Sequence, residues 1–255
     1  MTSIHAEESQ HEQYSLIYAN EAVAYQVVRQ AVADTAEPVV TVRVHPNTCV
    51  DVVVPDEASS QVIDETLQTR AKWIFEALGQ FQPSHNGIYG TVSKQDSPQF
   101  YLGRRYILAI AENAKAKPSV KLLRGQLVVT LKALDEKQSE RVKHLIAKWY
   151  KGRAERIVRE RLKHLHAQID WLEVLPEHRI LPMRNAWGAC ATDGALLLNP
   201  NLVKAPKACI DYVILDTLCR LHDPLKSESL LAELMPTWED AKQRLVDLVK
   251  RCSDI

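Results

Sequence analysis

The sequence is poor in the residues that build disulfide frameworks, and it has no segment that resembles a membrane span. Its 5 cysteines are odd in number and widely separated, and no two of them form a C-x-x-C pair. This pattern argues against a disulfide framework and a zinc ribbon and favours a reducing compartment, so we expect the protein in the cytoplasm. No run approaches the roughly 18 apolar residues that a spanning helix needs, so we expect no membrane association through such a helix.

An excess of charge of one sign is also missing. The 32 Lys and Arg residues balance the 32 Asp and Glu residues, so the formal net charge is +0. No overall field therefore steers the protein toward nucleic acid or an anionic membrane, and any charged surface must be local. Residues 1–13 are polar and lean acidic, unlike a signal peptide, and we expect them to form a disordered tail.

What the sequence does contain is enough apolar surface for a large core, with 46% hydrophobic residues. Residues 14–135 favour strands: the alternation in "VVTVRVH" and "TCVDVVVP" predicts a hairpin with its turn at residues 46–47. A helix is expected within residues 57–81, and Gly103 and Gly125 interrupt short apolar runs as turn glycines do. No internal repeat is visible in the sequence. This part is predicted to be β-rich with one helix.

The pattern changes in residues 136–255, which begin with a long amphipathic helix that contains Gly152. A second strand pair, "HRILPMRNAW" and "ALLLN", is expected to join through the turn dipeptide at residues 193–194. A helix follows Pro206, and "TWEDAKQRLVDLVKRC" predicts a last one. The chain is therefore expected to be an α+β protein, with the two parts forming one compact unit.

The helix "DYVILDTLCRL", residues 211–221, is apolar on nearly all sides and should be buried. Its polar interruptions are Asp216, Thr217 and Arg220. Asp216 and Arg220 lie one turn apart on the same face, which is the spacing at which the two histidines of a His-Glu-x-x-His helix bind zinc. The spacing of a metal site is present, but its ligands are not.

The residues around this helix resemble the YgjP-like family of zinc metallopeptidase-type hydrolases. "WGAC" from residue 187, Gly194, "LN" from residue 198, Pro206 and "DYV" from residue 211 follow the family pattern in order and without a gap. The likeness extends upstream to about Val40. It implies a minigluzincin-type twisted sheet packed on helices, with helix 211–221 at the floor of a cleft. It also implies structural roles for six residues, namely Trp187, Gly188, Cys190, Asn199, Asp211 and Tyr212.

Carried over residue by residue, the resemblance places Asp216 and Arg220 at two metal-ligand positions, Lys226 at the third and Thr217 at the general base. Arg and Lys carry no lone pair to offer a metal at neutral pH. Loss of a general base alone typically removes about 10²- to 10⁴-fold of catalysis. We therefore expect a pseudoenzyme without zinc, retained for a binding or regulatory role with an unidentified protein partner. An i, i+4 ion pair between Asp216 and Arg220 is the expected arrangement.

One alternative is a metal-dependent hydrolase with a displaced site. Such a site would combine Asp216 with Cys219, His222 or Asp223. His164 and His166 point to nearly opposite faces of their helix, so they cannot share a metal ion.

A second alternative is a module that binds nucleic acid or a nucleotide through the basic helix 141–163. Trp149 and Tyr150 would serve as stacking surfaces. The cations of the expected ridge are Lys148, Lys151, Arg153, Arg156 and Arg159. The competing interpretation is that these charges only solvate the exposed face of an amphipathic helix.

Overall fold

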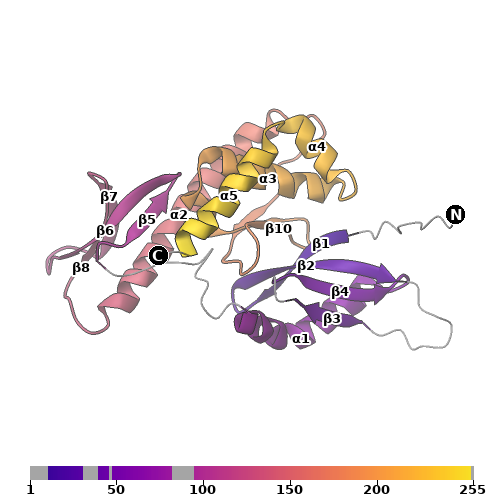
Figure 1. Ribbon diagram of the computed structural model, residues 1–255, viewed down its shortest axis with the longest axis horizontal. Helices are drawn as coiled ribbons and strands as arrows, with labels where there is room; N and C mark the ends of the chain where they lie inside the picture. The colour runs from indigo at the N-terminus through magenta and orange to yellow at the C-terminus, as the bar shows by residue number, and fades with distance from the viewer. Residues whose placement is uncertain (1–10, 31–39, 46–47, 82–94, 254–255) are drawn as a thin grey trace.

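The structure is a computed structural model, and it describes residues 11–30, 40–45, 48–81 and 95–253. Within these ranges it combines three β-sheets with five α-helices, which confirms the α+β class. Two four-stranded sheets lie toward opposite ends of the molecule, and helices occupy the space near the third sheet (Figure 1). No helix of the described part is long and apolar enough to cross a membrane.

The first sheet has the strand order β1-β2-β4-β3, with a parallel pair, β2 and β4, at its centre. Strand β1 begins inside the segment that was expected to be a disordered tail, because its backbone pairs with β2 from His11 onward. The predicted pairing of β3 with β4 is confirmed, while the turn residues 46–47 lie outside the described ranges. The strands are β1 (His11–Tyr18), β2 (Glu21–Gln30), β3 (Thr41–Val44) and β4 (Val50–Pro55).

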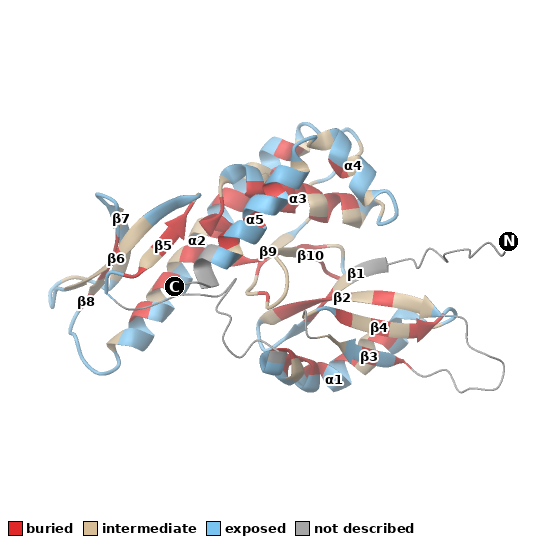
Figure 2. Cartoon of the chain, in the orientation of Figure 1, coloured by how far each residue is buried: buried red, intermediate tan, exposed pale blue. Residues whose placement is uncertain are grey.

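Helix α1 (Ser60–Phe81) follows this sheet, as predicted. Its buried residues include Leu67, Ile74 and Leu78, which are 1%, 0% and 0% exposed and form one stripe at helical spacing. Val62 and Trp73 were expected to share that stripe, but they lie on the opposite side of the helix and are 46% and 48% exposed. Figure 2 shows the resulting alternation of buried and exposed positions along α1.

The second sheet repeats the topology of the first, which the sequence did not reveal. Its order is β5-β6-β8-β7, again with a central parallel pair, β6 and β8, between antiparallel neighbours. A helix, α2 (Gln138–His166), again follows the fourth strand, and it continues without interruption through Gly152. The strands are β5 (Pro98–Tyr101), β6 (Arg104–Glu112), β7 (Ser119–Leu123) and β8 (Gln126–Leu131).

Three hairpins use two-residue turns in which both residues have positive φ. These turns are Ala19–Asn20, Leu102–Gly103 and Arg124–Gly125. Positive φ at both central positions is the geometry that matches the twist of antiparallel strands. The predicted turn glycines at 103 and 125 are confirmed, whereas the turn at 19–20 has no glycine to mark it.

The third sheet differs from the predicted strand pair. Strand β11 (Leu196–Leu198) pairs antiparallel with β10 (Gly188–Cys190) through the turn at residues 193–194, and parallel with β9 (His178–Ile180). The hairpin partner is therefore β10 and not the "HRI" segment. A short 3₁₀ helix, η1 (Pro200–Lys204), leads from β11 into the last helices.

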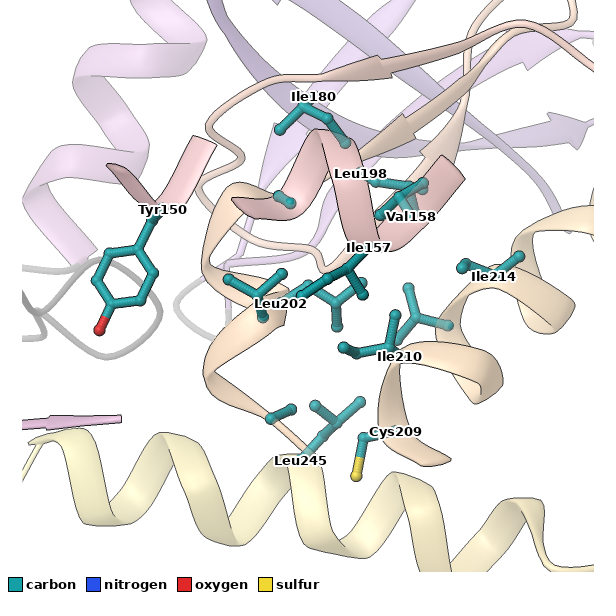
Figure 3. Packing of buried hydrophobic residues seen from close by; sticks show 14 of the residues in the cluster. Tyr150, Ile157, Val158, Ile180, Leu198, Leu202, Cys209, Ile210, Ile214 and Leu245 are labelled. Atoms are coloured by element: carbon teal, nitrogen blue, oxygen red, sulfur yellow. The ribbon is translucent and has the colours of Figure 1, made fainter. Parts of the chain in front are cut away.

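Three helices complete the chain: α3 (Lys207–His222), α4 (Ser227–Leu234) and α5 (Trp238–Ser253). The sequence predicted α3 and α5, but α4 was not expected. The largest buried cluster joins α2, α3 and α5 to β5–β8 and η1 (Figure 3). Residues 98–131 thus pack with the C-terminal helices, and a domain boundary near residue 135 stays a prediction.

Candidate functional site

Two contacts position the beginning of α3. The turn at Leu102–Gly103 donates backbone hydrogen bonds to Val203 and Lys204 over 2.8 and 3.0 Å, immediately before Pro206. A Cβ added to Gly103 would lie 2.8 Å from Pro206 Cγ, so glycine is needed for this close approach as well as for its φ of +78°. One turn into α3, Asp211 accepts two hydrogen bonds from Arg161 of α2.

The expected ion pair between Asp216 and Arg220 is confirmed. Arg220 Nη2 donates to Asp216 Oδ1 over 3.0 Å, and the side chains of Arg220 and Asp216 are 37% and 22% exposed. Beneath them the helix is apolar: Ile210 and Ile214 are 0% exposed and Leu218 is 1% exposed. Two of the three positions that the resemblance assigns to metal ligands are therefore bonded to each other.

Burial has the largest effect on the ionisation of Asp216, because it disfavours the charged carboxylate and raises the pKa of this group. Arg220 opposes that effect through its charge and its hydrogen bond, and the charge of Lys242 from α5 also lowers the pKa. Two cations thus favour the charged form of this carboxylate. Its pKa remains above the ordinary value of 3.8.

Thr217 occupies the position that the resemblance gives to the general base. Its side chain is 2% exposed, and its Oγ1 donates to the carbonyl oxygen of Val213 over 2.7 Å. A Cβ added to Gly188 of β10 would lie 2.6 Å from this oxygen, so the hydroxyl packs tightly against the neighbouring strand. A threonine hydroxyl that is bonded to its own helix cannot act as a general base near neutral pH.

A cleft opens above the Asp216–Arg220 pair, with a volume of about 310 Å³. Helix α3 contributes the floor of this cleft, while β2, α4 and α5 contribute its walls. The side chains that line it include Gln26, Tyr212, Asp216, Arg220, Trp238 and Lys242.

Lys226, the third position that the resemblance assigns to a metal ligand, is not among the residues that line this cleft. Its side chain is 74% exposed and its Nζ lies 3.6 Å from Asp223 Oδ2. The turn between α3 and α4 therefore directs this cation toward solvent and away from the Asp216–Arg220 pair.

The residues proposed for a displaced metal site have other environments. Cys219 is 0% exposed, and burial raises the pKa of its thiol to about 12, so it is a poor source of thiolate. The ring of His222 stacks on Trp171 at 4.2 Å, and Asp223 accepts from backbone N–H groups after α3. Across the part of the chain that the structure describes, no group of three His, Cys, Asp or Glu side chains is arranged to hold a metal ion.

Cys190 and Asn199 have the environment of structural residues. Burial raises the pKa of the Cys190 thiol to about 11, and its Sγ donates to the carbonyl oxygen of Thr217 over 3.4 Å. Asn199, 0% exposed, donates to Met183 and Ala186 and accepts from the Asn201 backbone at the start of η1. These bonds hold the loop before β10 and the start of η1 together.

Tyr212 and Trp238 form one wall of the cleft. Their rings stack with centroids 6.3 Å apart and an interplanar angle of 18°. Burial raises the pKa of Tyr212 to about 12, so its phenol stays protonated and neutral. Lys242 Nζ lies over the Trp238 ring at 5.4 Å, which places a cation on the aromatic wall.

The predicted basic ridge of α2 is only partly available. Lys148, Lys151, Arg156 and Arg159 are exposed, but Arg153 is half-buried over the ring of Trp149 at 5.2 Å. This cation–π contact occupies the side chain.

Tyr150 was expected to offer a stacking surface beside this ridge, and that expectation is wrong. The residue is 2% exposed, and its hydroxyl donates to the carbonyl oxygen of Phe100 over 2.7 Å. Figure 3 shows Tyr150 in the buried cluster. Its ring packs in the core and is not presented to a base.

Sequence reasoning missed the residues that come to the cleft from outside α3. Gln26, Trp238 and Lys242 lie on β2 and α5, far apart in the chain, and no local motif contains them. The only available signal was the amphipathic pattern of the last helix, which shows that α5 packs on a partner but does not identify that partner.

Helix α3 thus lies beneath the cleft and beside the three-stranded sheet of an α+β structure. A comparison with protein families matches residues 39–247 to the family described as "YgjP-like, metallopeptidase domain". The chain belongs to the YgjP-like family. No curated protein and no solved structure matches it.

Proposed function

We propose that this protein is a catalytically inactive member of its family, and that its cleft has a binding or regulatory role. The observation that carries the proposal is the 3.0 Å hydrogen bond from Arg220 to Asp216. It fills, with two opposite charges, the place where the resemblance puts two ligands of one zinc ion. In addition, the position that the resemblance assigns to the general base holds Thr217, whose hydroxyl is bonded to its own helix.

Zinc does not fit these residues. A zinc ligand must offer a lone pair, which neither the guanidinium cation of Arg220 nor the ammonium cation of Lys226 has. The one carboxylate, Asp216, is already bonded to a cation. A metal ion would have to displace that cation and tolerate its charge nearby.

The cleft itself supports a binding role. Its volume of about 310 Å³ is at the lower end of the range for small-molecule sites. The stacked rings of Tyr212 and Trp238 offer an apolar wall, and Lys242 adds a cation at its edge. A small molecule or a side chain of a protein partner could use both features.

Metal analysis of the purified protein tests the proposal. The protein should be produced in zinc-supplemented medium, dialysed without chelator and measured by plasma mass spectrometry beside a peptidase assay. We expect well under one zinc per chain, no peptidase activity and no change of melting temperature on addition of a chelator. Stoichiometric zinc together with chelator-sensitive activity would contradict the proposal and favour a hydrolase with a displaced site.

A further inference from the structure

Charge is unevenly distributed along this neutral chain. Residues 95–163 contain 17 Lys and Arg against 7 Asp and Glu, a net charge of +10. Residues 1–94 contain 5 against 12, and residues 164–255 contain 10 against 13, so the remainder of the protein is acidic. In the structure residues 95–163 are strands β5–β8 and helix α2, which we call the basic lobe.

The exposed face of α2 concentrates this charge in a row. Lys148, Lys151, Arg156, Arg159 and Lys163 are all exposed. Four of them lie opposite the centre of the buried face of the helix, and Lys151 lies at the edge of the exposed face. At about 1.5 Å per residue, the row extends over roughly 22 Å.

The other two cations between residues 148 and 163 have partners: Arg153 lies over Trp149, and Arg161 is bonded to Asp211. The five cations of the row have no ion pair among the described residues. Two exposed acidic residues of the same helix, Glu155 and Glu160, are interspersed with these cations.

Gly152 lies in the middle of this row. A glycine in a helix interior costs about 1 kcal/mol relative to alanine, and it is usually explained by close packing or by a positive φ. Neither explanation holds at Gly152, because a Cβ added there would meet nothing within 4 Å and its φ is not positive. The position leaves a gap between the side chains of Lys148 and Arg156, one turn away on either side. An external chain could approach the helix backbone through that gap.

We propose that the row on α2 binds duplex nucleic acid through its phosphates, without reading base sequence. The regular row of cations and the gap at Gly152 fit a polyanion with closely spaced charges, and about 22 Å corresponds to roughly six base pairs. A single strand is disfavoured because Tyr150 is buried and Trp149 is packed against Tyr101 and Arg153, so neither ring is presented to a base. This surface is separate from the cleft, so the proposal does not depend on the proposed function.

A salt titration measures the predicted contacts. The anisotropy of a fluorescent duplex of about 20 base pairs, of arbitrary sequence, should be followed with the full chain between about 50 and 200 mM salt. Five phosphate contacts predict a slope of log K against log salt of about −4.5, and a second duplex of unrelated sequence should give the same value. A single strand of the same length should bind more weakly.

Charge variants show whether the row carries the binding. Changing Lys148, Lys151, Arg156 and Arg159 to Gln should reduce the slope by about 3 to 4 and weaken binding at 100 mM salt by at least about tenfold. Glu155→Gln should strengthen binding. A matched control removes four exposed cations elsewhere and should leave the slope unchanged: Arg70→Gln, Lys72→Gln, Lys207→Gln and Arg244→Gln.

Gly152→Gln separates a binding role from a structural one. The substitution should stabilise the helix, because glutamine is a better helix former than glycine, and yet weaken duplex binding severalfold by filling the gap. Higher stability with unchanged affinity would contradict close approach at this position. No duplex binding at 50 mM salt, equal loss in the control variant, or tighter binding of heparin or of the single strand would overturn the proposal as a whole.

Discussion

The guanidinium of Arg161 holds the carboxylate of Asp211 with two hydrogen bonds, Nε to Oδ1 at 2.6 Å and Nη2 to Oδ2 at 2.9 Å. The side chains are only 19% and 16% exposed. This bidentate pair ties α2, which carries the cationic row, to the first turns of α3, which forms the floor of the cleft. Parallel bonds between two planar groups fix the relative orientation of the two helices as well as their distance.

Removal of one partner should therefore weaken the fold measurably. Asp211→Asn leaves Arg161 without a negative partner in a largely buried position, and hydrogen bonds to charged groups contribute about 1.5 to 3 kcal/mol. We expect the free energy of unfolding to fall by about that amount in urea denaturation. The circular dichroism of the variant should remain that of a folded protein.

Arg179 provides the control for this prediction. It bonds to Asp193 over 2.6 Å, but the side chains are 37% and 50% exposed, so water competes for both groups. Arg179→Gln should therefore cost clearly less stability than Asp211→Asn. If both variants lost the same stability, burial would not be what makes the Arg161–Asp211 pair important.

The Arg161–Asp211 pair shows how much of the site could be predicted from the sequence. The resemblance implies a structural role for Asp211, but its partner Arg161 lies 50 residues away in the chain. In the sequence, Arg161 cannot be distinguished from the other cations of a basic helix. Periodicity predicts most of the apolar face of α2, but it does not include the buried residues Tyr150 and Ala154. It does not reveal which cation of α2 reaches another element, since that depends on how the helices cross.

The repeated topology of the two four-stranded sheets was invisible for a similar reason. Both sheets need only alternating apolar residues and turns with positive φ, which different side chains satisfy. The turn at Ala19–Asn20 uses alanine and asparagine where the second sheet uses glycine at 103 and 125. The two sheets share their strand order and burial pattern but not their residues, so a search for repeated sequence does not find this similarity.

The ionisation of Asp216 should make stability depend on pH. Because burial raises the pKa of this group above 3.8 in the folded protein, the folded state keeps its proton to a higher pH than the unfolded chain. Wild-type stability therefore falls as the pH rises from the pKa of Asp216 in the unfolded chain to its higher pKa in the folded protein. Asp216→Asn removes the effect, so the stability of this variant relative to wild type, measured by urea denaturation, should increase as the pH rises above 3.8.

Asp193 should behave in the opposite way. Its hydrogen bond from Arg179 lowers its pKa below 3.8, so wild-type stability rises with pH through the interval below that value. Asp193→Asn should accordingly lose stability relative to wild type between about pH 2 and 4. A flat difference for Asp216→Asn, beside the expected change for Asp193→Asn, would show that Asp216 has an ordinary pKa.

Restoring the family residues should create metal affinity if the backbone geometry has been kept. The variant combines Asp216→His, Thr217→Glu, Arg220→His and Lys226→His, and it should bind about one zinc per folded chain, measured by mass spectrometry after dialysis. Since Lys226 now points to solvent, the turn after α3 must rearrange for the third ligand to reach the metal. Asp216→His with Arg220→His alone serves as the control and should bind zinc more weakly. A folded variant that retains no zinc would contradict the assigned positions.

Gly188 of β10 lies where this strand packs closely against α3, beneath the cleft. A Cβ added there would lie 2.6 Å from Thr217 Oγ1 and 2.9 Å from Val213 Cγ1, which is closer than real side chains approach. Gly188→Ala should therefore lower the free energy of unfolding by about 1 to 3 kcal/mol through overpacking against α3. Adding Thr217→Ala removes the nearer atom, so the double variant should be more stable than the sum of the two single effects predicts. Strict additivity would mean that β10 shifts away from α3 as a whole, and that the tight contact at Thr217 does not hold the strand in place.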